Sequence, residues 1–509
     1  MLDYLRCFVQ DSPLIRLRFL RMLRAVVVLC AIASANLFVA SPVHAQTLEL
    51  EPCRITAGPS YPSIKARCGK LLRPENPAAP DSPDITLRVA VVPALNLSPA
   101  SDVVVPIAGG PGQSTVQFYA AYQFAFEPLR RNRDILLVDQ RGTGESSALD
   151  CDVDDELITG NFSAETTRQV TADCLAELSH DPRFFTTSVA VTDLEAVRVA
   201  LGYSALNLYG ISYGTRVAQH FARQYPGVTR TIVLDGVVPP QVSLGPEIAT
   251  ESQRAVEQIF ERCAADPACH ERFPGVAAAF ARLVTTLRDA PVVVNAPHPN
   301  TGRVEAVTFG TGEFAAAVRL LLYDPNTIAL LPLLIHEAAN GNWVPLASQY
   351  QMTVVSLGES LSMGMHNTIM CSEDTPFYDK TTIDFAGLAA SYIGPVQLEA
   401  IDTICSVWPA GPVDDEFKVP LVTTIPTLLL SGDADPITPP RYADLAAVDL
   451  GNARHLIGKG QGHGQLGVGC MPELLEDFVE TANLDALDAS CLERAFVMPF
   501  FIDFSGPQP

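Results

Sequence analysis

Gly210-Ile211-Ser212-Tyr213-Gly214 stands between a short apolar run, Leu206 to Tyr209, and a helical pattern, Thr215 to Tyr225. A serine held in a sharp turn from strand to helix needs small neighbours on both sides, and the two glycines provide them. The five residues alone would also fit an ordinary glycine turn. Their place between a strand and a helix predicts instead a turn that presents Ser212 as a nucleophile.

Strand-like runs and helical patterns alternate on both sides of this turn. The predicted strands are Ile85 to Pro93, Asp102 to Ala108, Asp134 to Val138, Leu206 to Tyr209, Thr231 to Leu234, Thr427 to Leu430 and His455 to Ile457. Helical patterns lie between them, for example Asp193 to Ala200. This alternation predicts the α/β class, with a mostly parallel central sheet and helices on both faces.

The pattern changes between Pro239 and Val413, where long Ala- and Leu-rich stretches are helical and strand-like runs are few. The clearest helical stretches are Ile248 to Cys263, Gly275 to Arg288 and Gly312 to Leu322. Neither flanking part has enough strands to close a core alone. We therefore expect one sheet domain made of residues 46–238 and 414–509, with residues 239–413 inserted as a helical cap before the last strands.

Serine is a weak nucleophile unless a base activates it and a carboxylate orients that base. Where the serine lies on a strand-to-helix turn, the acid and then the histidine follow on loops after later strands. Gly432-Asp433-Ala434-Asp435-Pro436 comes directly after one late strand, and Gly460-Gln461-Gly462-His463-Gly464 comes after the next. The order predicts Ser212 as nucleophile, Asp435 as acid and His463 as base.

The acid and the base that would assist Ser212 each have an alternative nearby in the sequence. Asp433 could be the acid, but Asp435 lies deeper in the loop and precedes a Pro-containing turn that would hold it in place. His455 could be the base, but it belongs to a strand pattern and fits a packed side chain better. His463 lies between glycines on a loop and is free to reach the serine.

Acyl transfer also needs N–H donors for the negative charge that develops on the substrate oxygen. Ala108-Gly109-Gly110-Pro111-Gly112 follows a predicted strand, as expected for the turn that supplies one donor. We assign the donors to the main-chain N–H groups of Gly110 and Tyr213, with Gly109 as the alternative to Gly110. A phosphate-binding loop is excluded because the lysine and hydroxyl of that motif are missing.

The N-terminus has the order of a signal peptide in residues 1–45. Arg16, Arg18, Arg21 and Arg24 precede an apolar run from Ala25 to Ala40, and a small-residue cleavage site follows before Gln46. The run is shorter than a spanning helix needs, so a retained anchor is the weaker alternative. Met22 is a second candidate start. We expect an exported protein, periplasmic or secreted, with no membrane association after cleavage.

Ten of the 12 cysteines lie beyond residue 45, and an even number in an exported chain suggests disulfides. The simplest hypothesis joins sequence neighbours: Cys53–Cys68, Cys151–Cys174, Cys263–Cys269, Cys371–Cys405 and Cys470–Cys491. Their spacing does not fit metal ligands. We expect no metal and no cofactor.

The formal charge of −23 argues against nucleic acid and anionic membranes as partners. The expected partner is a small peptide substrate, and the sequence does not define the oligomeric state.

Several motifs together resemble the prolyl aminopeptidase and tripeptidyl aminopeptidase (TAP-like) group of serine peptidases within the α/β-hydrolases. They are Gly109-Gly110-Pro111-Gly112, Asp139-Gln140-Arg141-Gly142-Thr143-Gly144-Glu145-Ser146, the stretch from Thr192 through Thr215, Leu234-Asp235-Gly236-Val237, Cys405-Ser406-Val407-Trp408-Pro409 and Gly432 to Pro440. The resemblance implies an α/β-hydrolase fold and a serine exopeptidase that releases residues or short peptides from free N-termini.

Residue chemistry alone supports only acyl transfer to water, so an esterase or lipase-like hydrolase stays open, as does a non-catalytic protein of hydrolase fold. A peptidase of this kind must neutralise a buried substrate ammonium with a carboxylate from the cap side. Glu373 is the first candidate and Asp374 the second, because a disulfide at Cys371 would fix their loop. Paired acids in a loop are more often solvated or cap a helix.

Overall fold

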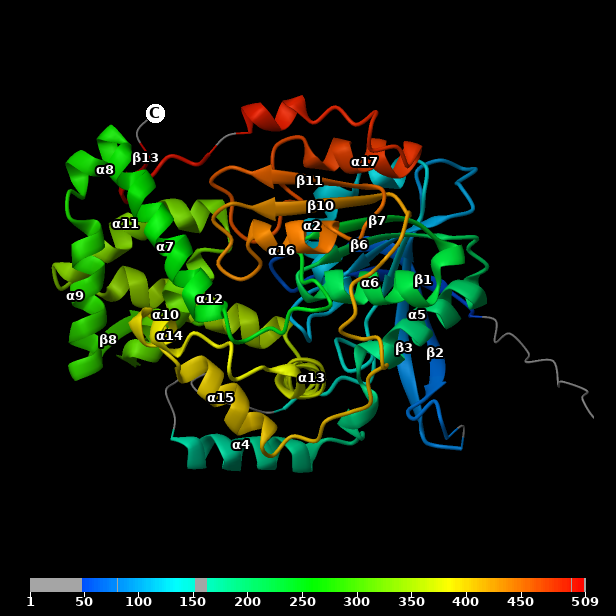
Figure 1. Cartoon of the computed structure of the whole chain (residues 1–509), viewed down its shortest axis with the longest axis horizontal. Coiled ribbons are helices and arrows are strands. Elements are labelled where there is room, and N and C mark those ends of the chain that lie inside the picture. Colours follow the sequence, from blue (N-terminus) through cyan, green and yellow to red (C-terminus); the bar gives the residue numbers. More distant parts are fainter. Residues whose placement is uncertain (1–47, 80, 152–162, 496, 508–509) are drawn as a thin grey trace, which may run out of the picture. The chain divides into compact units, whose positions relative to one another are not determined.

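The computed structural model describes residues 48–79, 81–151, 163–495 and 497–507, so the predicted signal peptide, residues 1–45, lies outside the described residues. A nine-stranded sheet forms the centre, in the order β1-β2-β3-β5-β4-β6-β7-β10-β11 (Figure 1). The strands are β1 (Glu51–Ile55), β2 (Ile64–Pro74), β3 (Asp84–Val92), β4 (Val103–Ile107), β5 (Ile135–Val138), β6 (Leu206–Ile211), β7 (Thr229–Asp235), β10 (Thr427–Gly432) and β11 (Ala453–Gly458).

Strands β5, β4, β6, β7, β10 and β11 run parallel, and β1, β2 and β3 extend the sheet as antiparallel neighbours. The seven strands expected from the sequence are all present. Strands β1 and β2, which lie in a polar segment rich in proline, were not expected from the sequence. β2 (IKARCGKLLRP) exposes several basic side chains next to the edge strand β1, so its apolar content is too low for a clear strand signal.

Helices cover both faces of the sheet, and successive side chains of each strand point to opposite faces. In β10, Leu429 packs with helices α5, α6 and α16, whereas Leu428 and Leu430 pack with α2 and α17 on the opposite face. These helices are α2 (Thr115–Phe126), α5 (Thr187–Leu201), α6 (Tyr213–Gln224), α16 (Pro440–Ala447) and α17 (Met471–Thr481). A parallel sheet buried on both faces explains why its strands read as near-continuous apolar runs.

Between β7 and β10 the chain is mainly helical, and we call this region the cap. Its elements are α7 (Ile248–Ala265), α8 (Pro267–Arg272), α9 (Val276–Asp289), β8 (Val292–Pro297), β9 (Val304–Phe309), α10 (Thr311–Leu321), α11 (Pro325–Ala339), α12 (Val344–Ser360), α13 (Met363–Ile369), the π-helical turn η4 (Met370–Asp374), α14 (Phe385–Ala390) and α15 (Val396–Cys405). The hairpin β8–β9 was not expected from the sequence.

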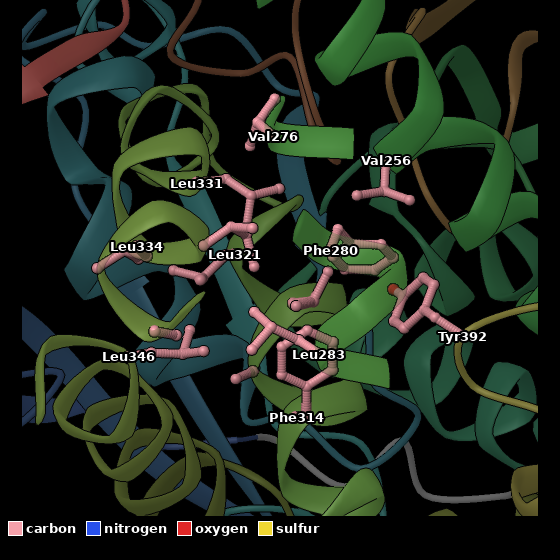
Figure 2. Packing of buried hydrophobic residues seen from close by; sticks show 14 of the residues in the cluster. Val256, Val276, Phe280, Leu283, Phe314, Leu321, Leu331, Leu334, Leu346 and Tyr392 are labelled. Carbon is pink, nitrogen blue, oxygen red and sulfur yellow. The ribbon is translucent and has the colours of Figure 1, made fainter. Parts of the chain in front are cut away.

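The cap has a hydrophobic core of its own (Figure 2). Phe280 contacts Phe314 and Tyr392 there, with ring centroids 5.4 and 5.5 Å apart. Helices α7 to α12 supply most of this core, and Figure 1 shows them gathered beside one end of the sheet. No helix in the described part of the chain has the length and apolar character needed to cross a bilayer.

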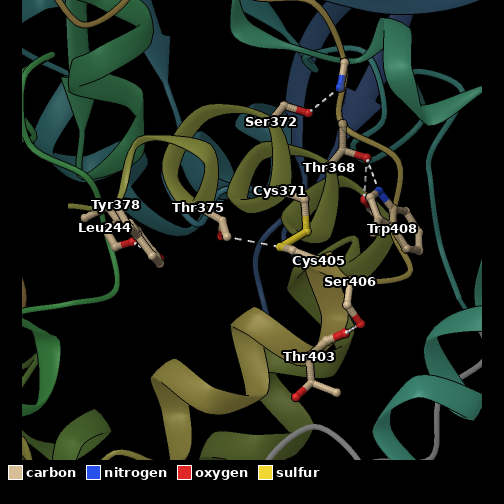
Figure 3. The surroundings of a disulfide bond; sticks show 12 residues. Leu244, Thr368, Cys371, Ser372, Thr375, Tyr378, Thr403, Cys405, Ser406 and Trp408 are labelled. Atoms are coloured by element: carbon tan, nitrogen blue, oxygen red, sulfur yellow. Dashed lines mark hydrogen bonds between the residues drawn. A yellow bond between two sulfur atoms is a disulfide. The ribbon is translucent and has the colours of Figure 1, made fainter. Parts of the chain in front are cut away.

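Five disulfide bonds occur among the described residues, and they join the pairs named in the sequence hypothesis. Cys371–Cys405 connects η4 to the end of α15 (Figure 3). Beside it, the indole N–H of Trp408 donates to Thr368 Oγ1 at 3.0 Å. The bond closes a loop across 34 positions and so ties the last helix of the cap to the segment that holds Glu373 and Asp374.

A buried ion pair attaches the cap to the helix that follows Ser212. Arg216 of α6 donates from two guanidinium nitrogens to the two oxygens of Asp374 in η4, at 3.0 and 2.8 Å. The side chains are 1% and 0% exposed. Burial opposes the charge on Asp374, but Arg216 and Lys418 outweigh it and hold the pKa of this carboxyl below its ordinary value.

The same group of residues holds both ends of the cap. Arg216 also donates to the carbonyl of Val242, and the N–H of Leu244 donates to Asp374 Oδ1, so the first residues after β7 are fixed here. Lys418, which lies near the end of the cap between α15 and β10, is 3.4 Å from Asp374 Oδ1. Burial, together with the nearby Arg216, lowers the pKa of Lys418 to about 8. We call Arg216, Asp374 and Lys418 the anchor.

We expect the protein that has lost residues 1–45 to contain no free thiol. Labelling with a maleimide in denaturant should modify no cysteine before reduction and all ten after reduction, as measured by intact mass. Each bond should contribute about 2–4 kcal/mol to stability. Stoichiometric labelling before reduction would contradict the disulfides.

We expect Arg216→Met to lower the free energy of unfolding by about 3–5 kcal/mol, because it leaves the buried Asp374 short of its main cation. The double variant Arg216→Met, Asp374→Leu removes both charges and should recover most of this loss. Urea unfolding followed by circular dichroism measures both changes.

The exposed pair Lys380–Asp402 provides the control, since Lys380 is 66% exposed in its side chain. Lys380→Met should change the free energy of unfolding by less than about 1 kcal/mol. A loss of the same size for Lys380→Met and Arg216→Met would argue against a special role for the anchor.

Candidate active site

Ser212 lies between the end of β6 and the start of α6, at the carboxyl edge of the sheet. Its backbone has φ 56° and ψ −125°, a strained conformation for a residue with a side chain. Its N–H donates to the carbonyl of Asp235 at 2.8 Å. Its own carbonyl accepts from Thr215 Oγ1 at 2.6 Å. The turn is therefore held from both sides and leaves the serine side chain partly exposed.

The glycines around Ser212 are needed for space. A Cβ at Gly210 would lie 2.3 Å from the carbonyl oxygen of Gly214, and one at Gly214 would lie 2.2 Å from the carbonyl oxygen of Ile107. A Cβ at Gly109 would lie 2.9 Å from the Cβ of Ser212. The loop after β4 thus touches the serine directly.

His463 and Asp435 come together from the loops after β11 and β10. His463 Nδ1 lies 2.8 Å from Asp435 Oδ2. Asp435 is fully buried, and its oxygens also accept from the N–H groups of Ile437 and Thr438 and from Thr438 Oγ1. Burial raises the pKa of Asp435, but His463 and these donors outweigh burial and hold it below the ordinary value.

The His463 ring is fixed by its neighbours. Its main-chain N–H donates to the carbonyl of Tyr323, whose ring packs edge-on against the imidazole at 4.9 Å between centroids. A Cβ at Gly236 would lie 3.0 Å from its Cε1 atom. Burial lowers the pKa of His463, whereas the Asp435 carboxylate and, more weakly, Asp235 raise it, with a net increase.

The second ring nitrogen, Nε2, is available to a reacting group. Among the described residues, none forms a hydrogen bond with His463 Nε2. Hydrogen bonds between a nucleophile and its base are often long without substrate and tighten in the complex.

The two alternatives weighed in the sequence have other partners. Asp433 Oδ1 accepts from the N–H of Gly460 at 2.7 Å. His455 lies between Asp444 Oδ1 and Ser431 Oγ, with 2.9 Å to each, on strand β11. The structure thus places Asp435 rather than Asp433 beside His463.

The loop after β4 presents main-chain N–H groups next to Ser212. Neither Gly110 nor Tyr213 donates its main-chain N–H to any described residue, so both are free to stabilise an oxyanion. The same holds for Gly109, and the alternative to Gly110 stays open. Gly110 has φ 106°, a conformation that favours glycine.

The cap supports this loop from above the sheet edge. The N–H of Ser362 donates to the carbonyl of Gly112 at 3.0 Å, and His366 Nδ1 lies 3.3 Å from the carbonyl oxygen of Pro111. The start of α13 therefore contacts the loop that carries the candidate oxyanion donors.

Glu373 and Asp374, the candidates for ammonium binding, are both fully buried and have internal partners. Asp374 belongs to the anchor. Glu373 Oε1 accepts from the N–H of Thr187 at 2.6 Å, and its Oε2 accepts from Thr187 Oγ1 at 2.9 Å. Burial raises the pKa of Glu373 to about 7. Their role in binding a substrate amine stays a prediction, and Asp374 is the less available of the two.

Asp235 received no role from the sequence alone, although this acid lies in the motif Leu234-Asp235-Gly236-Val237, which contributes to the family resemblance. Its position at the end of β7, on the same sheet edge as Ser212, is the signal that could have singled it out. No cluster of three or more His, Cys, Asp or Glu side chains suited to a metal occurs among the described residues.

Two known families match parts of the chain. Residues 102–270 match the family described as alpha/beta hydrolase fold, and residues 390–491 match the family described as TAP-like protein. Both confirm the fold and the resemblance expected from the sequence.

Named relatives are similar over different lengths. Serine protease Hip1 of Mycobacterium tuberculosis is 27% identical over 448 residues, which cover 81% of this chain and 84% of that protein. Tripeptidyl aminopeptidase of Streptomyces coelicolor is 26% identical over 168 residues, which cover 28% of this chain and 31% of that protein.

Among solved structures, proline iminopeptidase of Mycobacterium smegmatis is similar at 15% identity, over 82% of this chain and 99% of that chain, with a TM-score of 0.40.

The family matches and the named relatives, taken with the sheet order and the Ser212 turn, lead to one conclusion. The chain is a serine hydrolase of the α/β-hydrolase fold with a TAP-like C-terminal part.

Proposed function

We propose that this protein is an exported serine peptidase that cleaves peptides from a free N-terminus, with Ser212, His463 and Asp435 as its catalytic triad. The observation that carries the proposal is the 2.8 Å contact between His463 Nδ1 and the buried Asp435, at the sheet edge that also holds the strained Ser212 turn.

The first half of the reaction forms an acyl-enzyme. Ser212 Oγ attacks the carbonyl carbon of the scissile amide while His463 Nε2 accepts the serine proton. The carbonyl oxygen gains negative charge and receives hydrogen bonds from the N–H groups of Gly110 and Tyr213. His463 then gives the proton to the leaving amine, and the C–N bond breaks.

The second half releases the product. Water attacks the Ser212 ester, His463 takes a proton from this water, and the same proton returns to Ser212 Oγ as the C–O bond breaks. Asp435 keeps Nδ1 protonated and stabilises the imidazolium that forms in both halves. Its lowered pKa keeps it ionised throughout neutral pH.

Peptide rather than ester substrates are supported by the relatives, which are named serine protease and tripeptidyl aminopeptidase. Export is supported by the five disulfides, because such bonds persist in oxidising compartments. Residues 1–45 supply the signal in this proposal.

We expect Ser212→Ala and His463→Ala each to lower kcat by about 10⁴-fold or more, because the triad acts as a unit. Asp435→Asn should lower it by about 10³–10⁴-fold. Hydrolysis of an aminoacyl or tripeptidyl arylamide measures the rates. Labelling by a fluorophosphonate should map to Ser212 and disappear in Ser212→Ala.

The matched control is Asp433→Asn, two residues away on the same loop, which should retain kcat within about tenfold. A dead Asp433→Asn beside a nearly normal Asp435→Asn would overturn the assignment of the acid.

The pH profile should reflect the raised pKa of His463. The base must be neutral, so kcat/KM falls as the pH drops through this pKa, and a raised value places the acid limb at higher pH. Asp435→Asn removes the main cause of the increase, so its residual activity should show an acid limb at lower pH. An unmoved limb would mean that another group controls it.

Substrate pairs test the recognition of a free N-terminus. We expect acetylation of the substrate amine to lower kcat/KM on arylamides by about 100-fold or more, because it removes the ammonium and leaves the carboxylate that binds it without a partner. Glu373→Gln should lower kcat/KM for free-amine substrates more than for N-acylated esters. Asp374→Asn should lower both together, because it weakens the anchor.

Equal losses on both substrate types for Glu373→Gln would assign Glu373 to packing alone, with the amine bound elsewhere. Esters cleaved far better than any free-amine arylamide would favour an esterase over the proposed peptidase.

A further inference from the structure

Asp235 is a buried carboxylate that contacts both halves of the candidate active site. Its main-chain carbonyl accepts the N–H of Ser212 at 2.8 Å. Its side-chain oxygens Oδ1 and Oδ2 each lie 2.8 Å from the N–H of Gln465, two residues after His463. Tyr209 donates its hydroxyl to Oδ2 at 2.6 Å. One residue thus bridges the nucleophile turn and the loop of the base.

A carboxylate in this place is costly to bury. Asp235 is 0% exposed, and among the described residues no Lys or Arg forms an ion pair with it. Burial raises its pKa to about 6, against the lowering effect of Tyr209 and Gln465, so the group is ionised at neutral pH. The titratable groups that face it are Tyr209, Tyr122, His463 and Asp435.

The two acids near His463 hold different parts of it. Asp435 bonds the imidazole ring, whereas Asp235 bonds the chain that carries the ring. Gly236, the next residue after Asp235, lies under the ring, where a Cβ would be 3.2 Å from Nδ1. The backbone at residues 235 and 236 therefore contacts Ser212, the imidazole and the His463 loop together.

We propose that Asp235 is a positioning residue for catalysis: it fixes the His463 loop against the Ser212 turn, and its negative charge stabilises the His463 imidazolium. This inference rests on the proposed function, in which Ser212 and His463 react. His463 gains a proton in each half of that reaction, so a second carboxylate below it favours each transition state. Asp235 touches no substrate and acts only through its neighbours.

Two substitutions separate the contact from the charge. Asp235→Asn keeps an oxygen that can accept from Gln465 N–H, and its amide can donate to the Tyr209 oxygen, but the charge is lost. Asp235→Ala loses the charge and the acceptor. We expect kcat to fall about tenfold for Asp235→Asn and about 100-fold for Asp235→Ala, with KM within about threefold.

The decisive measurement is the acid limb of kcat/KM against pH. A negative Asp235 raises the pKa of His463, so Asp235→Asn should move the limb to lower pH. A purely structural role would lower kcat and leave the limb in place. Thermal unfolding of each variant shows whether the fold is retained.

Asp139→Asn is the matched control. Asp139 is also a 0% exposed carboxylate directly after a strand, β5, and accepts from Ser114 Oγ at 2.7 Å and from the N–H of Val116 at 3.0 Å. His463 is not among the groups that shift its pKa. We expect Asp139→Asn to leave the acid limb at the wild-type pH.

Three results would overturn the proposal. The first is an acid limb of kcat/KM that stays at the wild-type pH in Asp235→Asn, and the second is a shift of this limb in Asp139→Asn as large as in Asp235→Asn. The third is a kcat of Asp235→Ala within twofold of wild type. Failure of the proposed function is seen separately, as full activity of Ser212→Ala.

Discussion

The close approach of three backbone segments around Ser212 is the constraint on which the rest of the site depends. Gly210, Gly214 and Gly109 lie where a Cβ would come within 2.2 to 2.9 Å of neighbouring atoms. Without side chains at these points, β6 can turn directly into α6 beside the loop after β4. The serine then stands at the sheet edge with free N–H groups on either side of it.

This local constraint explains why much of the site could be predicted from the sequence. A glycine-flanked serine after an apolar run defines the turn, and the parallel strands that follow bring their loops to the same edge. Asp435 could be preferred over Asp433 from its depth in the loop, and the structure gives it the His463 contact. The strand positions followed from apolar runs that are buried on both faces of the sheet.

Interactions between residues far apart in the chain could not be predicted in this way. Asp235 and Gln465 are separated by 230 positions, and nothing in either local pattern indicates that a carboxylate meets that N–H. Glu373 and Asp374 form a conspicuous acidic pair in the sequence, but their partners Thr187 and Arg216 lie in distant helices. From the sequence alone, such a pair of acids suggests a binding site for a cationic ligand. Only the structure shows which cations and hydrogen-bond donors of the chain itself already bind them.

The buried carboxylates differ in how their charge is compensated. Asp374 is met by Arg216 and Lys418, and Asp435 by the imidazole and several donors, so their pKa values are low. Asp235 relies mainly on hydrogen bonds, whereas Glu373 relies on Arg216, 3.8 Å away, and on hydrogen bonds from Thr187. These partners offset burial only in part, so the pKa values of Asp235 and Glu373 rise to about 6 and 7. The first two stay charged over a wide pH range. The other two hold their charge only weakly and respond to any charge that forms nearby.

The anchor links the cap to the reaction through one helix. Arg216 lies on α6 one turn beyond Ser212, so the ion pair that attaches η4 also acts on the helix whose first N–H is a candidate oxyanion donor. The hydrophobic core formed by α7 to α12 is separate from this contact. Changes in that core can therefore alter the cap while Arg216 and Asp374 still attach η4 to α6.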